Sequence, residues 1–413
     1  MSQNTTCVII GASHAGVNLA FALRKEGWEG SIIIFDKDSK LPYHRPPLSK
    51  KYLELEDSIQ NNLLKPEESY TKDNIDLQLG VSVVSINTEE RFVQLDNNSV
   101  QHYDKLVFAT GARAFIPPIK GIQQAKHVFT LRNANDVDGI RKALHTSKTK
   151  KVVVIGGGYI GLETAASLKK LSADVTVLER EDRILARVTT TYLSKFFDEL
   201  HRANGVSIFT NKNVTEITNT NHVICNDGSA YEADIIIVGV GIRVHTELAE
   251  SIGLKLENGI HVNTKTETSQ KDIYAIGDCT YHYNGIYDRF VRLESVQNAV
   301  DQAKVAAKNI CGKEIIYETL PWFWSDQYDI KLQIVGLADG HDDKVVRVEE
   351  DKKFSIWYFK GKQLLAVDSI NNAKSYVLGT KYIKTKAEID KIKLADPASD
   401  LKSIVVINQN EIN

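Results

Sequence analysis

Two glycine-rich stretches, each followed by an acidic residue, suggest nucleotide chemistry. The first reads Gly11-Ala-Ser-His-Ala-Gly16 after a short apolar run, and Asp36 ends the next apolar run. A strand, a glycine turn, a helix and a second strand ending in an acid bind a dinucleotide, because the helix N-terminus offers free N–H groups to the pyrophosphate and the acid accepts hydrogen bonds from ribose hydroxyls. Ser13 stands where the central glycine is usual, and serine is small enough for the prediction to stand.

The pattern recurs in the second stretch with all three glycines. It reads Gly156-Gly-Gly158-Tyr-Ile-Gly161, an alanine-rich helical pattern follows, and Glu179 ends the next apolar run. A carboxylate that bridges the ribose hydroxyls would repel the extra 2′-phosphate of NADP, so the pattern predicts a preference for NADH. Use of NADPH stays open as an alternative, because Arg180 follows Glu179 directly.

Later segments repeat as well, which indicates two similar units in one chain. The strand pattern at 103–111 ends in small residues and is echoed at 231–241. Such apolar runs between helical patterns favour βαβ units with parallel strands. Two units imply two nucleotides, one fixed and one exchanging, which is the arrangement of a flavin enzyme.

A proline-rich basic loop and one aspartate are further candidates. The segment Pro42-Tyr-His-Arg45-Pro-Pro-Leu-Ser-Lys50 follows the first acid, and its prolines predict no regular secondary structure before about Leu48. Loops that carry Arg and Lys near a cofactor are often functional, although a solvated basic loop explains the composition equally well. Asp278 follows a strand pattern at 272–276, and in open α/β sheets ligands bind at the carboxyl ends of the strands.

Charge and cysteine usage exclude several function classes. The 413 residues carry a net charge of −2, which gives no overall attraction to nucleic acid or to an anionic membrane. We see no signal-peptide pattern, and apolar runs such as 235–238 are far below the about 20 residues that span a bilayer, so we expect a cytoplasmic protein. The cysteines lie too far apart to predict a disulfide framework, a zinc site or a redox dithiol: they are Cys7, Cys225, Cys279 and Cys311.

The composition shifts at Leu320-Pro-Trp-Phe-Trp324, where a different kind of domain is expected to begin. Helical patterns near its end start at about Asn372 and about Lys386. The predicted fold class is α/β, with two nested Rossmann-like dinucleotide-binding domains and a C-terminal α+β domain. An antiparallel meander is predicted in the last domain from alternating strand patterns at 331–336, 344–349, 354–359 and 364–370.

Taken together, the chain resembles the FAD-dependent pyridine nucleotide-disulfide reductase superfamily over essentially its whole length. Within it, the chain is similar to the NADH-dependent ferredoxin or rubredoxin reductases that serve cytochromes P450 and ring-hydroxylating oxygenases. The sharpest segment is Arg45-Pro-Pro-Leu-Ser-Lys50, because disulfide reductases place their redox cysteine pair in the corresponding loop region and this chain has none there. The other segments that carry the resemblance are Pro42–His44, Ala109–Gly111, Gly156–Glu163, Gly277-Asp278, Arg292–Ala299 and Trp322–Gln327.

The resemblance assigns the first unit to FAD and the second to NAD(H). The expected boundaries are 1–112 and 243–319 for a discontinuous FAD-binding domain, 113–242 for an NAD-binding domain and 320–413 for the C-terminal domain. The residues implied for FAD are Gly11, Ser13, His14, Ala15, Gly16, Asp36, Lys37, Arg45, Lys50, Val83, Ala109, Thr110, Gly111, Arg132, Asp278, Val296 and Trp324. Those implied for NAD are Gly156, Gly158, Tyr159, Ile160, Gly161, Glu179, Arg180, Arg187 and Gly241.

The resemblance also implies a reaction and its catalytic residues. NADH would deliver hydride to the flavin, and single electrons would pass to a [2Fe-2S] ferredoxin or a rubredoxin. Lys50 would lie near the flavin N5 and pair with Glu163, and Tyr159 would cover the flavin until the nicotinamide displaces it. Trp324 would line the opposite side, closer to the acceptor.

Two alternatives stay open, and the partner is set only by class. An NADH oxidase with a small acceptor usually uses a redox cysteine in the loop after the second strand, and none lies between Asp36 and Lys51. A redox-sensing protein resembling the apoptosis-inducing flavoproteins would carry a targeting sequence. We expect a monomer or a homodimer with no nucleic-acid, membrane or metal partner. The candidate docking charges for an acidic ferredoxin are Arg289, Arg292, Lys331 and the rim at 50–51.

Overall fold

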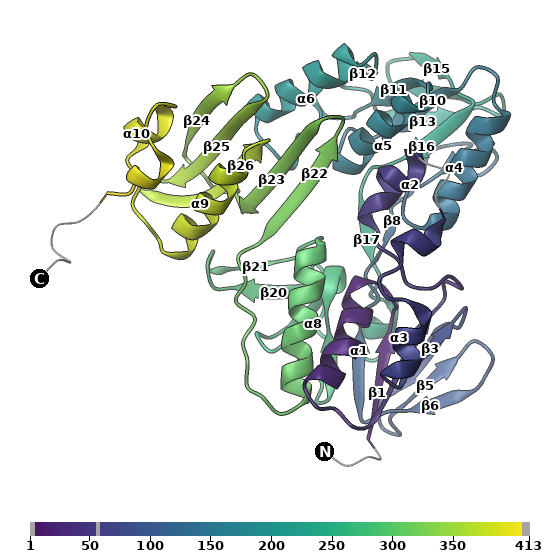
Figure 1. Ribbon diagram of the computed structural model, residues 1–413. Helices are drawn as coiled ribbons and strands as arrows, with labels where there is room; N and C mark the ends of the chain where they lie inside the picture. Colours follow the sequence, from purple (N-terminus) through teal and green to yellow (C-terminus); the bar gives the residue numbers. More distant parts are fainter. Residues whose placement is uncertain (1–4, 55–57, 407–413) are drawn as a thin grey trace, which may run out of the picture. The chain divides into compact units, whose positions relative to one another are not determined.

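The computed structural model describes residues 5–54 and 58–406, and the chain forms two compact units (Figure 1). The first unit spans Met1–Tyr317 and the second spans Glu318–Asn413. Parallel sheets lie in the first unit and an antiparallel sheet in the second, so the fold class expected from the sequence is confirmed. Within the described residues, no helix combines the length and the apolarity needed to cross a membrane.

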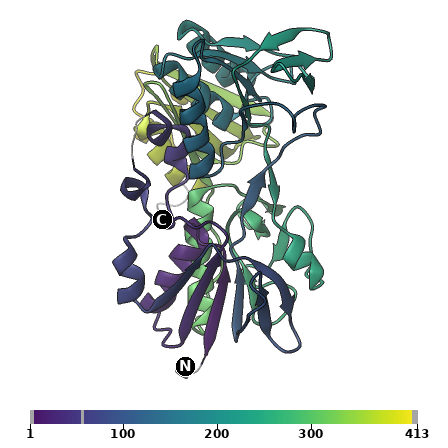
Figure 2. The ribbon, with the colours of Figure 1, turned by 90° about the vertical axis from the view of Figure 1, so that its right-hand side faces the viewer.

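A five-stranded parallel sheet contains the N-terminal strand. In sheet order its strands are β19 (Ile273–Ala275), β7 (Lys105–Phe108), β1 (Thr6–Ile10), β2 (Ser31–Asp36) and β3 (Ile75–Leu79). Alternate residues of β1 enter two cores, Cys7 and Ile9 on one face and Val8 and Ile10 on the other, which is why the strand reads as one apolar run. Helices α1 (His14–Lys25) and α8 (Val296–Ile310) pack side by side over the first of these faces (Figures 1 and 2).

The second parallel sheet repeats the first. In sheet order its strands are β12 (Ser207–Phe209), β11 (Asp174–Leu178), β10 (Lys151–Ile155), β16 (Ile235–Val238) and β9 (Val128–Phe129). In each sheet the strand before the glycine turn is the central strand. The strand that ends in the acid lies directly beside it. The helices of this half are α4 (Ala134–Thr146), α5 (Tyr159–Lys170) and α6 (Thr191–Ala203).

Shorter elements complete the first unit. Antiparallel pairing joins β4 (Val83–Asn87), β5 (Phe92–Leu95) and β6 (Val100–His102), and likewise β13 (Val214–Ile217), β14 (His222–Cys225) and β15 (Ala230–Glu232). The other strands are β8 (Ala112–Ala114) with β17 (Ile242–Val244), and β18 (Ile260–Val262) with β20 (Thr280–Asn284) and β21 (Arg289–Val291). The short helices are η1 (Pro46–Ser49), α2 (Lys51–Glu54), η2 (Ile59–Asn62), α3 (Glu67–Lys72), α7 (Glu247–Ser251) and η3 (Gly277–Cys279).

The proline loop corrects one expectation. A lack of regular structure before about Leu48 was expected, yet η1 already starts at Pro46. Its two prolines occupy the first turn, where a missing N–H costs nothing and the fixed φ suits a helix.

The second unit is a five-stranded antiparallel sheet with α9 (Ala373–Lys384), α10 (Lys391–Ala395) and η4 (Leu401–Ser403). The expected meander is wrong at one point, because β23 (Ile330–Gly336) pairs with β26 (Gln363–Ile370) instead of with β24 (Asp343–Glu350). The second helix begins at Lys391, since Asp390 caps it by accepting hydrogen bonds from the N–H groups of Ile392 and Lys393. The strands, in sheet order, are β22 (Trp322–Gln327), β23 (Ile330–Gly336), β26 (Gln363–Ile370), β25 (Lys353–Lys360) and β24 (Asp343–Glu350).

Burial explains this strand order. Strands β25 and β26 are buried along almost their whole length, and their buried backbone N–H and C=O groups are paired when a strand lies on each side. Strand β24 has several exposed residues and forms an edge, as mixed charge at an edge blocks further pairing.

One buried arginine ties the end of the described chain to this sheet. Arg347 on β24 is 4% exposed, and its Nε donates to Glu349 Oε1 at 2.7 Å. Its other guanidinium nitrogens donate to four carbonyl oxygens at 2.8–3.1 Å, one in α10 and three in the segment after it. All five guanidinium donors are therefore used.

We expect the Arg347→Met variant to destabilise the second unit by about 3–5 kcal/mol, because it removes a buried charge that pairs with Glu349 and donates to four carbonyl oxygens. Urea unfolding followed by tryptophan fluorescence measures this, since three of the four tryptophans lie in the second unit. The matched control is Lys352→Met, whose exposed ion pair with Asp329 should contribute about 1 kcal/mol or less. Equal urea midpoints for the two variants would contradict this stabilising role of Arg347.

Candidate functional site

The first glycine turn requires glycine at two positions. Gly11 has a φ of +112°, and a Cβ there would lie 2.3 Å from the carbonyl oxygen of Ala109. A Cβ on Gly16 would lie 1.9 Å from the carbonyl oxygen of Gly11, so α1 starts against the turn itself. The N–H of Ala12 donates to Asp36 Oδ2 at 2.6 Å, which holds the acid beside the start of α1.

The second glycine turn has the same construction. Gly156 has a φ of +109°, and a Cβ on Gly161 would lie 2.1 Å from the carbonyl oxygen of Gly156. The N–H of Gly157 donates to Glu179 Oε2 at 2.7 Å. A Cβ on Gly158 would meet nothing within 4 Å, which explains why the equivalent position of the first turn can be Ser13.

Both helices after the glycine turns present a first turn that no capping side chain covers. Ser13 stands at the N-cap position of α1 but its side chain forms no capping hydrogen bond, and Gly158, at the N-cap position of α5, has no side chain. The N–H groups at such a terminus, together with the helix dipole, attract an anion. Each half of the first unit therefore has the geometry to receive a pyrophosphate.

Two arginines and an aspartate from distant segments meet at the start of α1. Arg45 Nε donates to Ser13 Oγ at 3.4 Å, and an Arg45 terminal nitrogen donates to the carbonyl oxygen of Arg132 at 2.7 Å. Arg132 in turn forms an ion pair with Asp278 Oδ2 at 3.4 Å. Burial raises the pKa of Asp278 above its usual range, and the Arg132 charge opposes that rise. The cluster is positively charged where a pyrophosphate would lie.

His14 supplies a direct test of whether a cofactor fits this cluster. The side chain is 6% exposed, and its Nε2 is buried without a hydrogen-bond partner among the described residues. Burial, followed by the nearby His44, Arg45 and Arg132, lowers the pKa of His14 to about 3, so the ring is neutral. An orphaned buried nitrogen beside a cationic helix start fits a polar ligand group in contact with it.

The loop after the first acid is fixed to α5 through one carboxylate. Glu163, with a side chain only 2% exposed, accepts hydrogen bonds on Oε2 from Lys50 Nζ at 2.7 Å and from Ser49 Oγ at 2.5 Å. Ser167, one turn further along α5, donates to the Ser49 carbonyl oxygen at 2.8 Å. The structure thus brings together the lysine and the glutamate that the resemblance pairs.

The other residues expected at the FAD site come from several elements. Ala109, Thr110 and Gly111 directly follow β7, and Gly277 packs against Ala15 of α1. Lys37 is exposed after β2, Val83 begins β4 and Val296 begins α8. Trp324 lies on β22 of the second unit, where its ring pairs with Trp322 at 5.4 Å.

The residues expected for NAD lie around the start of α5. Tyr159 and Ile160 form its first turn, with Ile160 46% exposed. Arg187 donates to the carbonyl oxygen of Val240, which precedes Gly241, at 3.4 Å. Arg180 is bound by Glu181 through two nitrogens, at 2.7 and 3.2 Å.

Sequence reasoning missed the roles of Tyr43 and Ser49. The Tyr43 hydroxyl donates to Asp38 Oδ2 and accepts from the N–H of Ala134, both at 3.0 Å, and the Arg45 guanidinium lies 4.7 Å from its ring centre. Both residues belong to the Pro42–Lys50 segment that carried the resemblance, which was the available signal.

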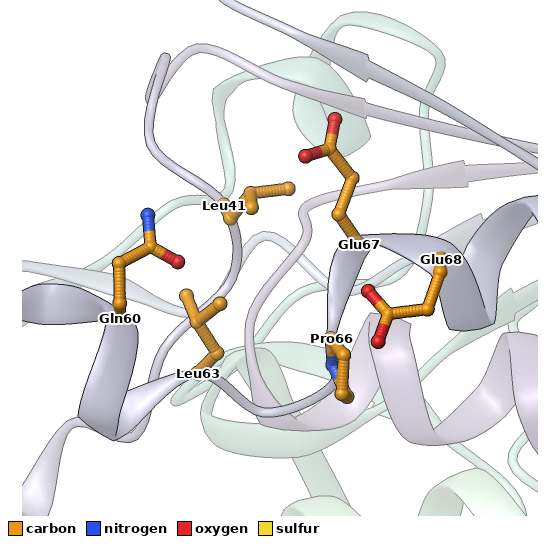
Figure 3. A pocket seen from close by; sticks show the side chains of 6 residues that line it. All are labelled: Leu41, Gln60, Leu63, Pro66, Glu67 and Glu68. Atoms are coloured by element: carbon orange, nitrogen blue, oxygen red, sulfur yellow. The ribbon is translucent and has the colours of Figure 1, made fainter.

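A pocket of about 370 Å³ lies beside Tyr43, which forms a backbone bridge with the lining residue Leu63 (Figure 3). None of its lining residues was expected at either nucleotide site, and its two glutamates make it unsuited to phosphate. The lining residues are Leu41, Gln60, Leu63, Pro66, Glu67 and Glu68.

Comparison with known proteins agrees with this geometry. Residues 5–303 match the family profile described as pyridine nucleotide-disulphide oxidoreductase, and residues 322–405 match the profile described as reductase C-terminal. The chain is 38% identical to putidaredoxin reductase of Pseudomonas putida, with all of both chains covered. It is also 38% identical to a rubredoxin-NAD(+) reductase of Pseudomonas putida, covering 89% of this chain and 96% of that protein.

A solved structure agrees over nearly the same length. The fold is similar to that in the crystal structure of the covalent putidaredoxin reductase–putidaredoxin complex, with a TM-score of 0.93, 38% identity and 98% of each chain covered. Two matching profiles, two relatives at this identity and one closely similar structure agree. The chain therefore belongs to the pyridine nucleotide-disulphide oxidoreductase family.

Proposed function

We propose that this chain is an FAD-containing reductase that takes hydride from NADH and passes single electrons to a small iron–sulfur protein, a [2Fe-2S] ferredoxin or a rubredoxin. The acceptor would feed a cytochrome P450 or a ring-hydroxylating oxygenase. The observation that carries the proposal is the pair of glycine turns in one compact unit, each with a carboxylate bound to its backbone. The names of two relatives, putidaredoxin reductase and rubredoxin-NAD(+) reductase, support the class of acceptor.

The first turn and the cluster beside it fit FAD. Asp36 would accept hydrogen bonds from the ribose hydroxyls. The start of α1, together with Arg45 and Arg132, would neutralise the pyrophosphate. His14 would contribute its orphaned Nε2, and Asp278 would bind the ribityl chain. FAD, when bound, supplies the chemistry that accepts a hydride and releases electrons one at a time. The remaining residues implied by the resemblance, Trp324 among them, are part of this proposal.

The second turn fits NADH, and its neighbours fit the transfer step. Glu179 would accept hydrogen bonds from ribose hydroxyls of NADH and would repel the 2′-phosphate of NADPH. Lys50, held by Glu163, would place a positive charge where reduction increases negative charge. Tyr159, at the start of α5, would cover the flavin until the nicotinamide displaces it.

The cysteines argue against thiol chemistry. Burial raises the pKa of Cys7 to about 12 and that of Cys279 to about 11, and it raises the pKa of Cys225 and Cys311 as well. Thiols of this kind do not form the thiolate that a cysteine-based oxidase needs. All four are free, which also supports the cytoplasmic location that we propose.

We further propose three domains. The first would comprise residues 1–112 and 243–319 and bind FAD, the second 113–242 and bind NAD(H), and the third 320–413. The proposal is supported by the repeat of the two parallel sheets within the first compact unit.

We expect Lys50→Ala to slow flavin reduction by NADH at least about tenfold, because the charge that stabilises the developing anion is lost. Anaerobic stopped-flow absorbance of FAD-loaded protein measures this rate. Lys51→Ala is the matched control, since Lys51 is exposed and adjacent in sequence. A Lys50→Ala rate equal to that of the control would remove Lys50 from the mechanism.

We expect Glu179→Ala to lower the ratio of kcat/KM for NADH to kcat/KM for NADPH at least about tenfold, which corresponds to about 1.4 kcal/mol of differential binding. The loss of the carboxylate removes both the ribose contact and the repulsion of a 2′-phosphate. Steady-state assays with both nucleotides give the ratio, and Glu232→Ala, an exposed glutamate of the same half, serves as the control. An unchanged ratio would show that nucleotide choice is made elsewhere.

A further inference from the structure

A buried polar network lies beneath the turn that carries Asp278. Its side chains come from α8, from β20 and from the last residue of the first unit, and each residue is at most 4% exposed. Hydrogen bonds between these side chains give the network a defined arrangement, although one of its buried atoms, His282 Nε2, has no partner among the described residues. Its members are Thr280, His282, Asn298, Gln302 and Tyr317.

The side-chain amide of Gln302 is the centre of this network. Its Oε1 accepts from the N–H of Gly277 at 2.7 Å and lies 3.0 Å from Thr280 Oγ1. A backbone N–H can only donate, so the oxygen must face the turn and the Nε2 group must face the other way. Nε2 then lies 3.3 Å from His282 Nδ1, which has to accept.

The surroundings of Gln302 fix this orientation. Burial lowers the pKa of His282 to about 4, which keeps the ring neutral and Nδ1 able to accept. The Tyr317 ring meets the His282 ring edge-on at 5.1 Å, and its hydroxyl donates to Asn298 Oδ1 at 2.8 Å. Asn298 Nδ2 reaches Gln302 Oε1 at 3.5 Å, so a second side chain supports the same oxygen.

The turn held by Gln302 has little freedom of its own. Gly277 has a φ of +82°, and a Cβ there would lie 3.0 Å from Cβ of Ala15, in the first turn of α1. Asp278 is the next residue and forms the ion pair with Arg132. A displaced Gly277 would therefore move Asp278 relative to the helix start that fits the pyrophosphate.

We propose that Gln302 is a positioning residue for the cofactor site, which holds the Gly277-Asp278 turn in the geometry that FAD binding requires. It acts through the Gly277 N–H, and its own side chain faces the network. The inference deepens the proposed function and rests on FAD binding at the first glycine turn.

The test uses the full chain freed of FAD, with flavin fluorescence titration for the Kd and hydrogen exchange for the Gly277 amide. Gln302→Met keeps the volume and removes both hydrogen-bonding atoms, so we expect the FAD Kd to rise at least about tenfold and Gly277 exchange to accelerate at least about tenfold. Asn309→Leu is the control on the same helix, because among the described residues its side chain bonds to Lys265 and Ile315, away from the turn. Both readings should stay within about twofold of the wild type in that variant.

Gln302→Glu provides a conservative rescue. Burial favours the protonated carboxyl group, whose C=O and O–H reproduce the acceptor toward Gly277 and the donor toward His282. We expect its FAD Kd within about threefold of the wild type. If Gln302→Met does not fold, an FAD Kd for Gln302→Glu that is tenfold above the wild-type value overturns the inference.

Two outcomes separate this inference from the proposed function. Wild-type affinity for FAD in Gln302→Met overturns the inference alone, because the first glycine turn still binds the cofactor. A wild-type chain that does not bind FAD overturns the proposed function and the inference with it.

Discussion

Both glycine turns depend on one hydrogen bond, from the N–H after the first glycine to the carboxylate that ends the neighbouring strand. Ala12 donates to Asp36 at 2.6 Å, and Gly157 donates to Glu179 at 2.7 Å. A bond to a charged acceptor is stronger than one between neutral groups, and it joins the ends of two adjacent strands to the start of one helix. The acid is therefore fixed beside the helix N-terminus before any ligand arrives, and its oxygens keep lone pairs for ribose hydroxyls.

The other parts of the site are arranged around these two fixed carboxylates. The prolines after the first acid start a short helix that delivers Ser49 and Lys50 to Glu163, so the loop of one half is bound to α5 of the other. The network around Gln302 fixes the turn that bears Asp278 beside the first turn of α1. The site thus depends on polar contacts between segments that are distant in sequence, and each of them is anchored to a helix.

Sequence alone predicts the local part of this arrangement. A glycine turn after a strand and an acid at the end of the next strand are local features, and so the two parallel sheets and their order of elements could be foreseen. The meeting of Arg45, Arg132 and Asp278 could not, because it depends on tertiary packing, and these residues entered only through the resemblance. The strand order of the C-terminal sheet was missed for a similar reason. An alternating pattern shows that a strand has a buried face, but it does not show which strand lies beside it.

The most direct test of the proposed electron transfer is anaerobic stopped-flow absorbance of the FAD-loaded protein, mixed first with NADH and then with an oxidised [2Fe-2S] ferredoxin. We expect rapid bleaching of the flavin by NADH, slower bleaching by NADPH, and then reduction of the ferredoxin by one electron per molecule. A flavin that NADH reduces while the ferredoxin and a rubredoxin both stay oxidised would contradict the proposal and assign the electrons to another acceptor.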